Sequence, residues 1–428
     1  MKRRWSLVLL CLLLVVPALA FGQAKTTLEL LIHQNDPMVN YINSMNEKFQ
    51  AKYPAITVNV SVVKADELAT STQTRLTAND VDVIDMFGFA QGILPFMKGV
   101  DKPNWQTLIE AGYLMDLTGQ PFLKFYDASA IKDAGSFNGR VYEVNTGRYA
   151  FTGVFYNKDL FAKYAVKVPT TWSQLLAAAA TFKKNGIAPM TCGGKDGWPV
   201  LVAGYGILLS YYPDQAALVK GLWTGEVKWN SPKSVEMWKR MQILARDLIE
   251  PGASAIAFDA APGRFASGAA AMLPAGSWDA PAIQAANPNL KLGYFPMPAS
   301  DNAADNKYLG GKYDVGWVVN AHTAKKDAAL KWLDFFSQPA NYQEYVTATG
   351  IMPTQPTATL NTAFGKEAKP YLANFRLGFE LLWANIKGQG QWMQPNASFF
   401  KPFNQWEDPA KLADQVQADL EVALKAAK

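Results

Sequence analysis

The sequence has few of the residues on which metal sites, disulfides and many catalytic sites depend. It contains two cysteines and two histidines in 428 residues. The histidines, His33 and His322, are not spaced with cysteine or with each other as zinc ligands are. The sequence also lacks a Walker A loop, a dinucleotide fingerprint and a G-x-S-x-G elbow. We therefore expect no metal, no cofactor and no catalytic residue.

Long apolar runs are scarce, and the clearest one lies at the start of the chain. Residues 7–16 are unbroken and apolar, and three basic residues precede them at positions 2–4. Small residues that permit cleavage follow at 18–20 and again at 22–24. The run is too short for an ordinary membrane span, so it predicts a cleaved signal peptide over residues 1–24 and a periplasmic protein.

The first cysteine, Cys11, raises the alternative of a lipid anchor. Lipid attachment needs a small residue before the cysteine, and Leu10 stands there, inside the apolar run. We therefore expect no lipid anchor. Removal of residues 1–24 would leave Cys192 as the one cysteine, so no disulfide could form within the chain. A chain of this length can bury enough apolar surface without one.

The charge of the chain is also small. Removal of residues 1–24 takes away three basic residues and no acidic ones, so the net charge falls from +5 to +2. No block of basic residues is present, which argues against nucleic acid as a partner. Aromatic residues, by contrast, make up 12% of the chain and often stand beside Gly, Pro or Asn. Such residues favour either stacking on a flat apolar ligand face or ordinary core packing.

Strand and helix patterns alternate along the chain and predict an α/β fold. Residues 28–33, 56–62 and 81–86 have strand patterns, and helical patterns separate them. Asp36 is the expected cap of the first of these helices, with Pro37 at its first position. This β-α-β-α-β order predicts a parallel sheet whose ligand-binding edge lies at the carboxyl ends of the strands.

A second α/β unit begins near residue 150. Residues 152–156 and 187–192 have strand patterns, and a helix is predicted between them. Thr171 and Gln174 fit a capping box at the start of that helix. The chain ends on an amphipathic helix with leucine or valine at every fourth position from residue 412 to residue 424. No linker separates the two units, which favours lobes that are joined by crossing strands.

Three ordered stretches give the chain a family resemblance. The first covers residues 155–161 and 168–172, the second residues 264–278, and the third residues 328–333 followed by a turn at 350–353. Their sequences include FYNKDLF and VPTTW, then RFASG, AAM and GSW, then AALKWL and GIMP. In these stretches the chain resembles family 1 extracellular solute-binding proteins, the group of carbohydrate receptors of ABC importers that includes maltose-binding protein.

The resemblance implies a two-lobed periplasmic-binding-protein fold of type II with a ligand cleft at the hinge. Each lobe would be discontinuous: residues 25–148 and 304–345 in the N-terminal lobe, and 149–303 and 346–428 in the C-terminal lobe. The lobes would close over a small carbohydrate, and the permease subunits of an ABC importer would then recognise the closed monomer. No chemistry on the ligand is implied.

Candidate ligand-binding residues come from the strand ends and from the resemblance. In the resembled family the tryptophan of the Gly-x-Trp run, Trp278 here, stacks on sugar, and Asp279 beside it would accept hydroxyl hydrogen bonds or cap a helix. The remaining candidates follow predicted strands, the glycine-rich turn or the expected crossings between lobes: Gln34, Asn35, Asp85, Gly88, Phe89, Arg148, Tyr149, Trp198, Gly311, Tyr313 and Trp392.

Other functions remain open at this level. The same fold could bind an amino acid or a polyamine, although an amine ligand would call for an acidic cage. A secreted polysaccharide-degrading enzyme would need two facing carboxylates, and the 36 acidic residues of the chain leave such a pair open. A receptor that presents sugar to a membrane sensor would have the same sequence features as one that serves an importer.

Overall fold

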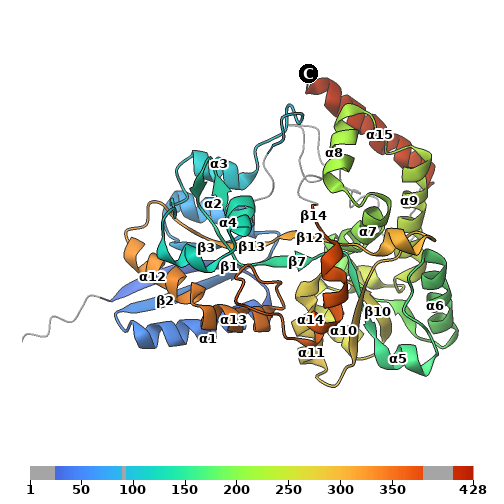
Figure 1. The fold of residues 1–428 in the computed structure, drawn as a ribbon, viewed down its shortest axis with the longest axis horizontal. Helices are drawn as coiled ribbons and strands as arrows, with labels where there is room; N and C mark the ends of the chain where they lie inside the picture. The colour runs from blue at the N-terminus through green and yellow to red at the C-terminus, as the bar shows by residue number, and fades with distance from the viewer. Residues whose placement is uncertain (1–24, 89–92, 379–407, 428) are drawn as a thin grey trace, which may run out of the picture.

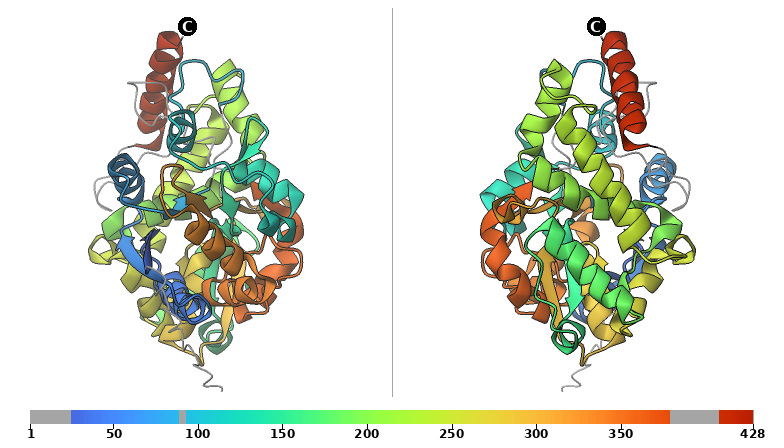
Figure 2. Two further views of the ribbon diagram at one scale, coloured as in Figure 1. Left: turned by 90° about the vertical axis from the view of Figure 1, so that its left-hand side faces the viewer. Right: turned by 90° about the vertical axis from the view of Figure 1, so that its right-hand side faces the viewer.

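The computed structural model describes residues 25–88, 93–378 and 408–427, which form two lobes side by side (Figure 1). Each lobe has its own sheet with helices around it, and a third, small sheet lies between them. The two views of Figure 2 face the first and the second lobe in turn. Segments far apart in sequence therefore meet in each lobe and at the junction.

The sheet of the first lobe has five strands in the order β2-β1-β3-β13-β6. These strands are β1 (Thr26–His33), β2 (Ile56–Val63), β3 (Val83–Phe87), β6 (Val144–Asn145) and β13 (Val315–Val319). β1 runs parallel to β2 and β3, as the sequence predicts, whereas β13 is antiparallel to β3 and β6. The carboxyl ends of β1 and β3 therefore lie at the same edge of this sheet.

The described part of the first lobe also contains six α-helices and a hairpin. They are α1 (Asp36–Lys52), α2 (Leu68–Ala78), α3 (Asn104–Glu110), α4 (Ala128–Gly135), α12 (Lys326–Ser337), α13 (Pro339–Thr349) and the hairpin of β4 (Ser136–Phe137) with β5 (Arg140–Val141). The apolar positions that predict α1 are buried in the core. The prediction that Asp36 caps α1 is wrong: Asn35 is the cap, and its Oδ1 accepts a hydrogen bond from the Met38 amide at 3.2 Å.

The sheet of the second lobe has four strands in the order β11-β8-β10-β9. These strands are β8 (Gly153–Asn157), β9 (Ala188–Met190), β10 (Ala270–Pro274) and β11 (Leu292–Pro296). β9 and β10 are parallel, so their carboxyl ends also share an edge. The helices of this lobe are α5 (Lys158–Lys163), α6 (Trp172–Lys184), α7 (Trp198–Tyr211), α8 (Gln215–Thr224), α9 (Pro232–Ile243), α10 (Ala261–Ala266), α11 (Ala280–Ala286), α14 (Ala363–Ala368) and α15 (Pro409–Ala426).

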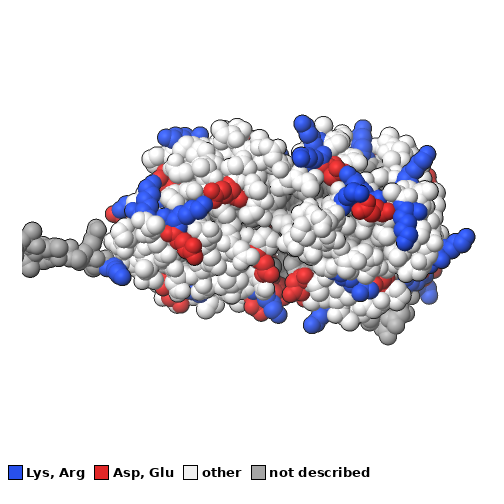
Figure 3. Space-filling model, turned by 90° about the horizontal axis from the view of Figure 1, so that it is seen from below, with Lys and Arg blue, Asp and Glu red and all other residues white. Residues whose placement is uncertain are grey.

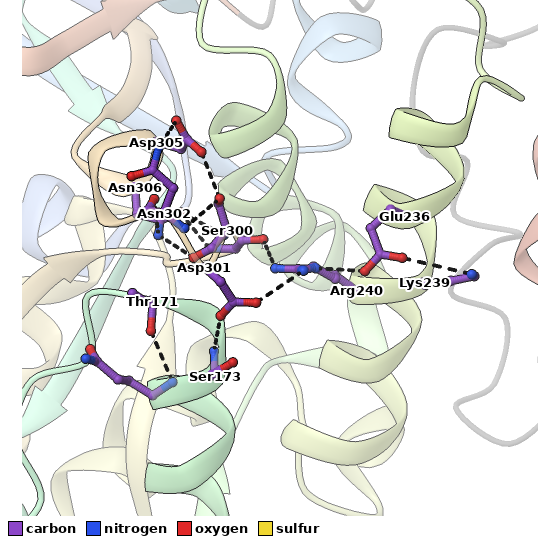
Figure 4. A network of polar contacts seen from close by, with 12 residues as sticks. Thr171, Ser173, Glu236, Lys239, Arg240, Ser300, Asp301, Asn302, Asp305 and Asn306 are labelled. Carbon is purple, nitrogen blue, oxygen red and sulfur yellow. Dashed lines mark hydrogen bonds and ion pairs between the residues drawn. The ribbon is translucent and has the colours of Figure 1, made fainter.

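A polar network fixes the start of α6 in the second lobe (Figure 4). Thr171 Oγ1 accepts a hydrogen bond from the Gln174 amide at 3.3 Å, as the predicted capping box requires. The Gln174 side chain, however, accepts from the Thr170 amide and not from that of Thr171. The Ser173 amide donates to Asp301, and Arg240 of α9 lies 3.6 Å from the same carboxylate. These contacts with Ser173 and Arg240 lower the pKa of Asp301 and tie three segments together.

Three strands lie between the lobes and form one small sheet. They are β7 (Arg148–Ala150), β12 (Leu309–Tyr313) and β14 (Phe375–Leu377), in the order β14-β12-β7. Figure 1 shows them between the two larger sheets. All strands of those sheets fall within the ranges assigned to each lobe from sequence, whereas β7 and β12 lie at the junction. The lobe boundaries themselves stay a prediction.

The lobes also meet at a distance from these crossing strands. Phe96, in the segment between β3 and α3, lies against Trp223 of α8, with ring centroids 6.5 Å apart in an edge-to-face arrangement. The first residue belongs to the first lobe and the second to the opposite lobe. The contact therefore joins the lobes without the backbone hydrogen bonds of the crossing strands.

Candidate functional site

Aromatic side chains gather where β9 and β10 of the second lobe end beside the crossing strand β7. The Trp278 ring lies 4.7 Å from the Phe151 ring and 5.8 Å from the Tyr149 ring, measured between centroids. Gly276 permits this arrangement, because a Cβ atom at that position would overlap the Trp278 ring. The carboxyl edge of a parallel strand pair is the usual position of a ligand in such sheets.

A second tryptophan extends this group toward the start of α7. The Trp198 ring is 6.0 Å from the Trp278 ring and 4.6 Å from the Phe258 ring. Both tryptophans are only partly buried. We call Tyr149, Phe151, Trp198, Phe258 and Trp278 the aromatic wall. Three predicted ligand residues, Tyr149, Trp198 and Trp278, thus meet in one cluster.

Asp279 directly follows Trp278 of the aromatic wall in the sequence and lies in an apolar environment. Its side chain is 4% exposed. It occupies the position before α11 but accepts no capping hydrogen bond, so the alternative role of helix cap is not supported. Burial raises the pKa of Asp279 well above its ordinary value. A carboxyl group in this state can accept hydrogen bonds from a ligand without first breaking an internal ion pair.

The first lobe brings a buried histidine and carboxylate to its side of the junction. His33 Nδ1 lies 2.5 Å from Asp85 Oδ2, and the Asp85 side chain is fully buried. Burial opposes protonation of His33, but the charges of Asp85 and Asp314 outweigh it and raise the pKa of His33. Asp85, a predicted ligand residue, is therefore already paired through one of its oxygens.

A second buried ion pair lies on the crossing segment itself. Lys312 Nζ is 2.8 Å from Asp314 Oδ1, and both side chains are nearly inaccessible. The Lys312 ammonium also lies 5.5 Å from the ring of Phe87 in the first lobe and 5.6 Å from that of Phe151 in the aromatic wall. This lysine therefore connects the two lobes at the centre of the junction.

The predicted residues on β7 and β12 pack against each other. The Arg148 guanidinium lies 5.9 Å from the Tyr313 ring and 5.7 Å from the Phe375 ring, and its Nε has no hydrogen-bond partner in the described part of the chain. Gly311 allows β7 to approach, since a Cβ atom there would overlap the Tyr149 carbonyl oxygen. Arg148, Tyr149, Gly311 and Tyr313 are thus brought together at the junction.

The remaining predicted ligand residues have no contact with the aromatic wall that the structure records. The Gln34 side chain is exposed after β1, and Asn35 is engaged as the cap of α1. Gly88 is buried after β3, where its amide donates to the Asp314 carbonyl. Phe89 and Trp392 lie outside the described residues. Whether any of these residues binds a ligand stays a prediction.

Sequence reasoning missed several residues of the junction: His33, Phe151, Phe258, Lys312 and Asp314. Lys312 lies between Gly311 and Tyr313, which were both predicted as ligand-binding residues. Because successive side chains of a strand point to opposite faces, the side chain of Lys312 could have been expected on the other face of the strand. Phe258 has no such signal, because it meets Trp198 through a loop 60 residues away in sequence.

Other features of the described chain do not compete with this site. Two surface cavities of about 460 and 300 Å³ lie beside α4 and α12, away from the aromatic wall. Within residues 25–88, 93–378 and 408–427, no three His, Cys, Asp or Glu side chains are grouped to hold a metal ion. In the same ranges no helix is long and apolar enough to cross a membrane. On the face shown in Figure 3, charged side chains of both signs lie interspersed over both lobes.

Known proteins resemble this chain over most of its length. The "Multiple sugar-binding protein" of Streptococcus mutans is 26% identical over 342 residues, which are 76% of this chain and 74% of that one. An "Uncharacterized ABC transporter extracellular-binding protein" of Pyrococcus horikoshii is 26% identical over 74% of this chain and 68% of its own length. Both are described as binding proteins.

Solved structures share the fold. The structure of "SBP RafE in complex with raffinose" matches with a TM-score of 0.74 at 21% identity, over 94% of this chain and 100% of that one. The predicted two-lobed α/β fold of the type II periplasmic binding proteins is thereby confirmed. The model of the family described as "Bacterial extracellular solute-binding protein" matches residues 35–343. The chain is therefore a member of the bacterial extracellular solute-binding protein family.

Proposed function

We propose that this protein captures a sugar or oligosaccharide between its two lobes and delivers it to an ABC importer. The observation that carries the proposal is the aromatic wall with buried polar groups beside it that lack partners. Trp278 Nε1, Arg148 Nε and Asp85 Oδ1 are enclosed and make no hydrogen bond with any residue that the structure describes. Such groups are costly unless a ligand satisfies them.

A carbohydrate has the two kinds of surface that this junction requires. The C–H faces of a pyranose ring are apolar and flat, so they can stack on the rings of Trp198 and Trp278. Its hydroxyl groups both donate and accept, so they can satisfy an indole N–H, a guanidinium N–H and a carboxylate oxygen at once. We therefore place the ligand against Tyr149, Arg148 and the two tryptophans.

The names of the relatives support the same proposal. One is a sugar-binding protein and another is an extracellular-binding protein of an ABC transporter. A role in transport requires closure of the lobes but no covalent chemistry, so we propose that the protein is not an enzyme. The predicted signal peptide over residues 1–24 supports a periplasmic location, where a monomer would meet the permease subunits.

A thermal-shift screen tests this function. Residues 25–428 would be heated with a panel of mono- and oligosaccharides, with amino acids and polyamines as controls. A ligand at 100 times its dissociation constant should add about 2.7 kcal/mol to the free energy of unfolding, which is a visible rise in the midpoint. If only amino acids or polyamines raise the midpoint, the ligand is not a sugar and the proposed ligand class is wrong. If incubation with glycans yields shortened products, the protein is a polysaccharide-degrading enzyme and not a binding protein.

A further inference from the structure

Asp279 differs from the other buried acidic groups near the junction because it has no partner. Asp85 is paired with His33, and Asp314 is paired with Lys312. Farther along the second lobe, Glu250 is paired with Arg264. The Asp279 amide donates to the Gly276 carbonyl, but its carboxyl group forms no hydrogen bond or ion pair with any described residue. Within the described part of the chain, no counter-charge is supplied to this buried acid.

The carboxyl group is nevertheless within reach of a ligand. Asp279 is 4% exposed, so a small part of the residue remains in contact with solvent. It follows Trp278 on the short turn after β10, at the edge where the aromatic wall lies. A group that is nine-tenths buried, unpaired and still accessible is placed to receive a hydrogen-bond donor from outside the chain.

The groups that face Asp279 from neighbouring segments do not supply its charge balance. Cys192 after β9 and Tyr294 of β11 both have pKa values raised chiefly by burial, with a further rise from the charge of Asp279. β7, which packs against the turn, carries Arg148 and Tyr149, but burial alone accounts for the raised pKa of Asp279. Its titratable neighbours therefore include a thiol and a phenol, and among the described residues no cation contributes to the raised pKa of Asp279.

We propose that Asp279 holds a proton in the free protein and gives it up when two hydroxyl groups of the ligand donate hydrogen bonds to it. The inference rests on the proposed sugar-binding function and adds to it that capture is coupled to pH. The O–H bond of the carboxyl group breaks and its proton passes to water or buffer as the ligand enters; the same bond forms again when the ligand leaves.

The physical reason lies in how burial and hydrogen bonds act on a carboxyl group. A carboxylate without a partner is poorly tolerated in an apolar environment, so the group becomes neutral instead. Hydroxyl donors stabilise the charged form and lower its pKa. In the pH range between the pKa of the complex and that of the free protein, binding releases a proton. Affinity in that range rises with pH by up to about tenfold per pH unit.

Calorimetric titration provides the test. Raffinose, stachyose and maltotriose would each be titrated into the protein between about pH 5 and about pH 8, in two buffers that differ in their heat of ionisation. For the sugar that binds, we expect affinity to rise with pH and up to one proton to be released. Asp279→Asn keeps the shape but cannot ionise, so its affinity should be constant with pH and no proton should be released. Asp159→Asn, at an exposed surface pair, is the matched control and should behave as the wild type.

A second measurement needs no ligand. Because the folded pKa of Asp279 is raised, the group favours folding at low pH and the wild type loses stability as pH rises through that pKa. The midpoint of thermal unfolding of Asp279→Asn should therefore increase relative to that of the wild type as pH rises. Parallel profiles would overturn the inference.

The outcomes separate the two proposals. If no carbohydrate binds, the proposed function fails and this inference fails with it. If a sugar binds to the wild type with the same affinity across the pH range and without proton release, the function stands and only the inference is overturned. The wild-type titration decides this point even if Asp279→Asn does not fold.

Discussion

The two lobes bring opposite kinds of chemistry to their junction. On the side of the first lobe and the crossing segment, the charged groups are paired within the chain, His33 with Asp85 and Lys312 with Asp314. On the side of the second lobe, aromatic rings stand beside Asp279, which makes no internal pair. The acidic groups Asp85 and Asp314 on the first side therefore already have a charged partner, whereas Asp279 on the other side has none among the described residues.

This difference indicates an order of events. A ligand that approaches the junction would find its stacking surfaces and an open acceptor on the second lobe. The first lobe would then close over it as a preformed surface whose internal pairs need not be broken. Paired charges serve such a surface well, because they hold its shape in a poorly solvated position.

The strongest test breaks the pair on the crossing segment. Lys312→Met would leave Asp314 buried without its partner, which should lower the free energy of unfolding by about 3–5 kcal/mol in urea denaturation. Lys48→Met removes an ion pair that is about half exposed and should cost less than about 1 kcal/mol. The double variant Lys312→Met/Asp314→Leu should recover most of the loss. If Lys312→Met and Lys48→Met lower the free energy of unfolding equally, the pair of Lys312 with Asp314 does not stabilise the free protein more than an exposed ion pair does.

A change in the aromatic wall should act on binding more than on folding. Trp278→Ala removes the central ring, so we expect affinity for the sugar identified in the screen to fall about a hundredfold. Trp278→Phe keeps a stacking face and should lose less. Trp105→Phe, on α3 of the first lobe, is the control for loss of an indole elsewhere. If the folded Trp278→Ala protein keeps the full affinity for the sugar, the second lobe does not supply the stacking surface for the ligand.

The histidine of the first lobe should make stability depend on pH. Because the folded pKa of His33 is raised above 6.5, the pair with Asp85 stabilises fully below that value and loses its contribution as pH rises through the folded pKa. Each unit of the raised pKa corresponds to about 1.4 kcal/mol. The difference in unfolding free energy between the wild type and His33→Gln should therefore shrink as pH rises above 6.5. The exposed His322→Gln is the control, and an unchanging difference would contradict the prediction.

The smallest effect concerns the contact between Phe96 and Trp223. If this edge-to-face pair helps to hold the lobes together, Phe96→Ala should weaken sugar binding by about two- to tenfold, the range of one aromatic pair. A double-mutant cycle with Trp223→Ala would isolate the pairwise contribution. Strictly additive effects of the two substitutions would show that the contact does not contribute to closure.

Much of the fold could be predicted from local sequence patterns. Alternating apolar residues located β2, and spacing of three and four residues located α1, because these periods follow from backbone geometry. The error at the start of α1 arose because Asn35 and Asp36 are both good caps and only one of them can be used. Boundaries of this kind are decided by tertiary contacts.

The site was partly predictable. Trp278 could be selected from its motif, and Tyr149 from the expected crossing between the lobes. The partners of Trp278, however, come from residues more than 70 positions away, and the ring of Phe151 reaches it from β7's end. The pairing of Lys312 with both lobes depends on how the crossing strands stack, which no local pattern records.

The position of β13 in the first sheet has a consequence for synthesis. This strand, residues 315–319, lies between β3 and β6, so the first sheet cannot be completed until it is available. At 5–20 residues per second, roughly 15 to 65 s pass before it has been made. During that time the chain would keep the edge of β3 unpaired and available to chaperones. The first lobe is therefore not expected to fold from residues 25–145 alone, because those residues lack β13.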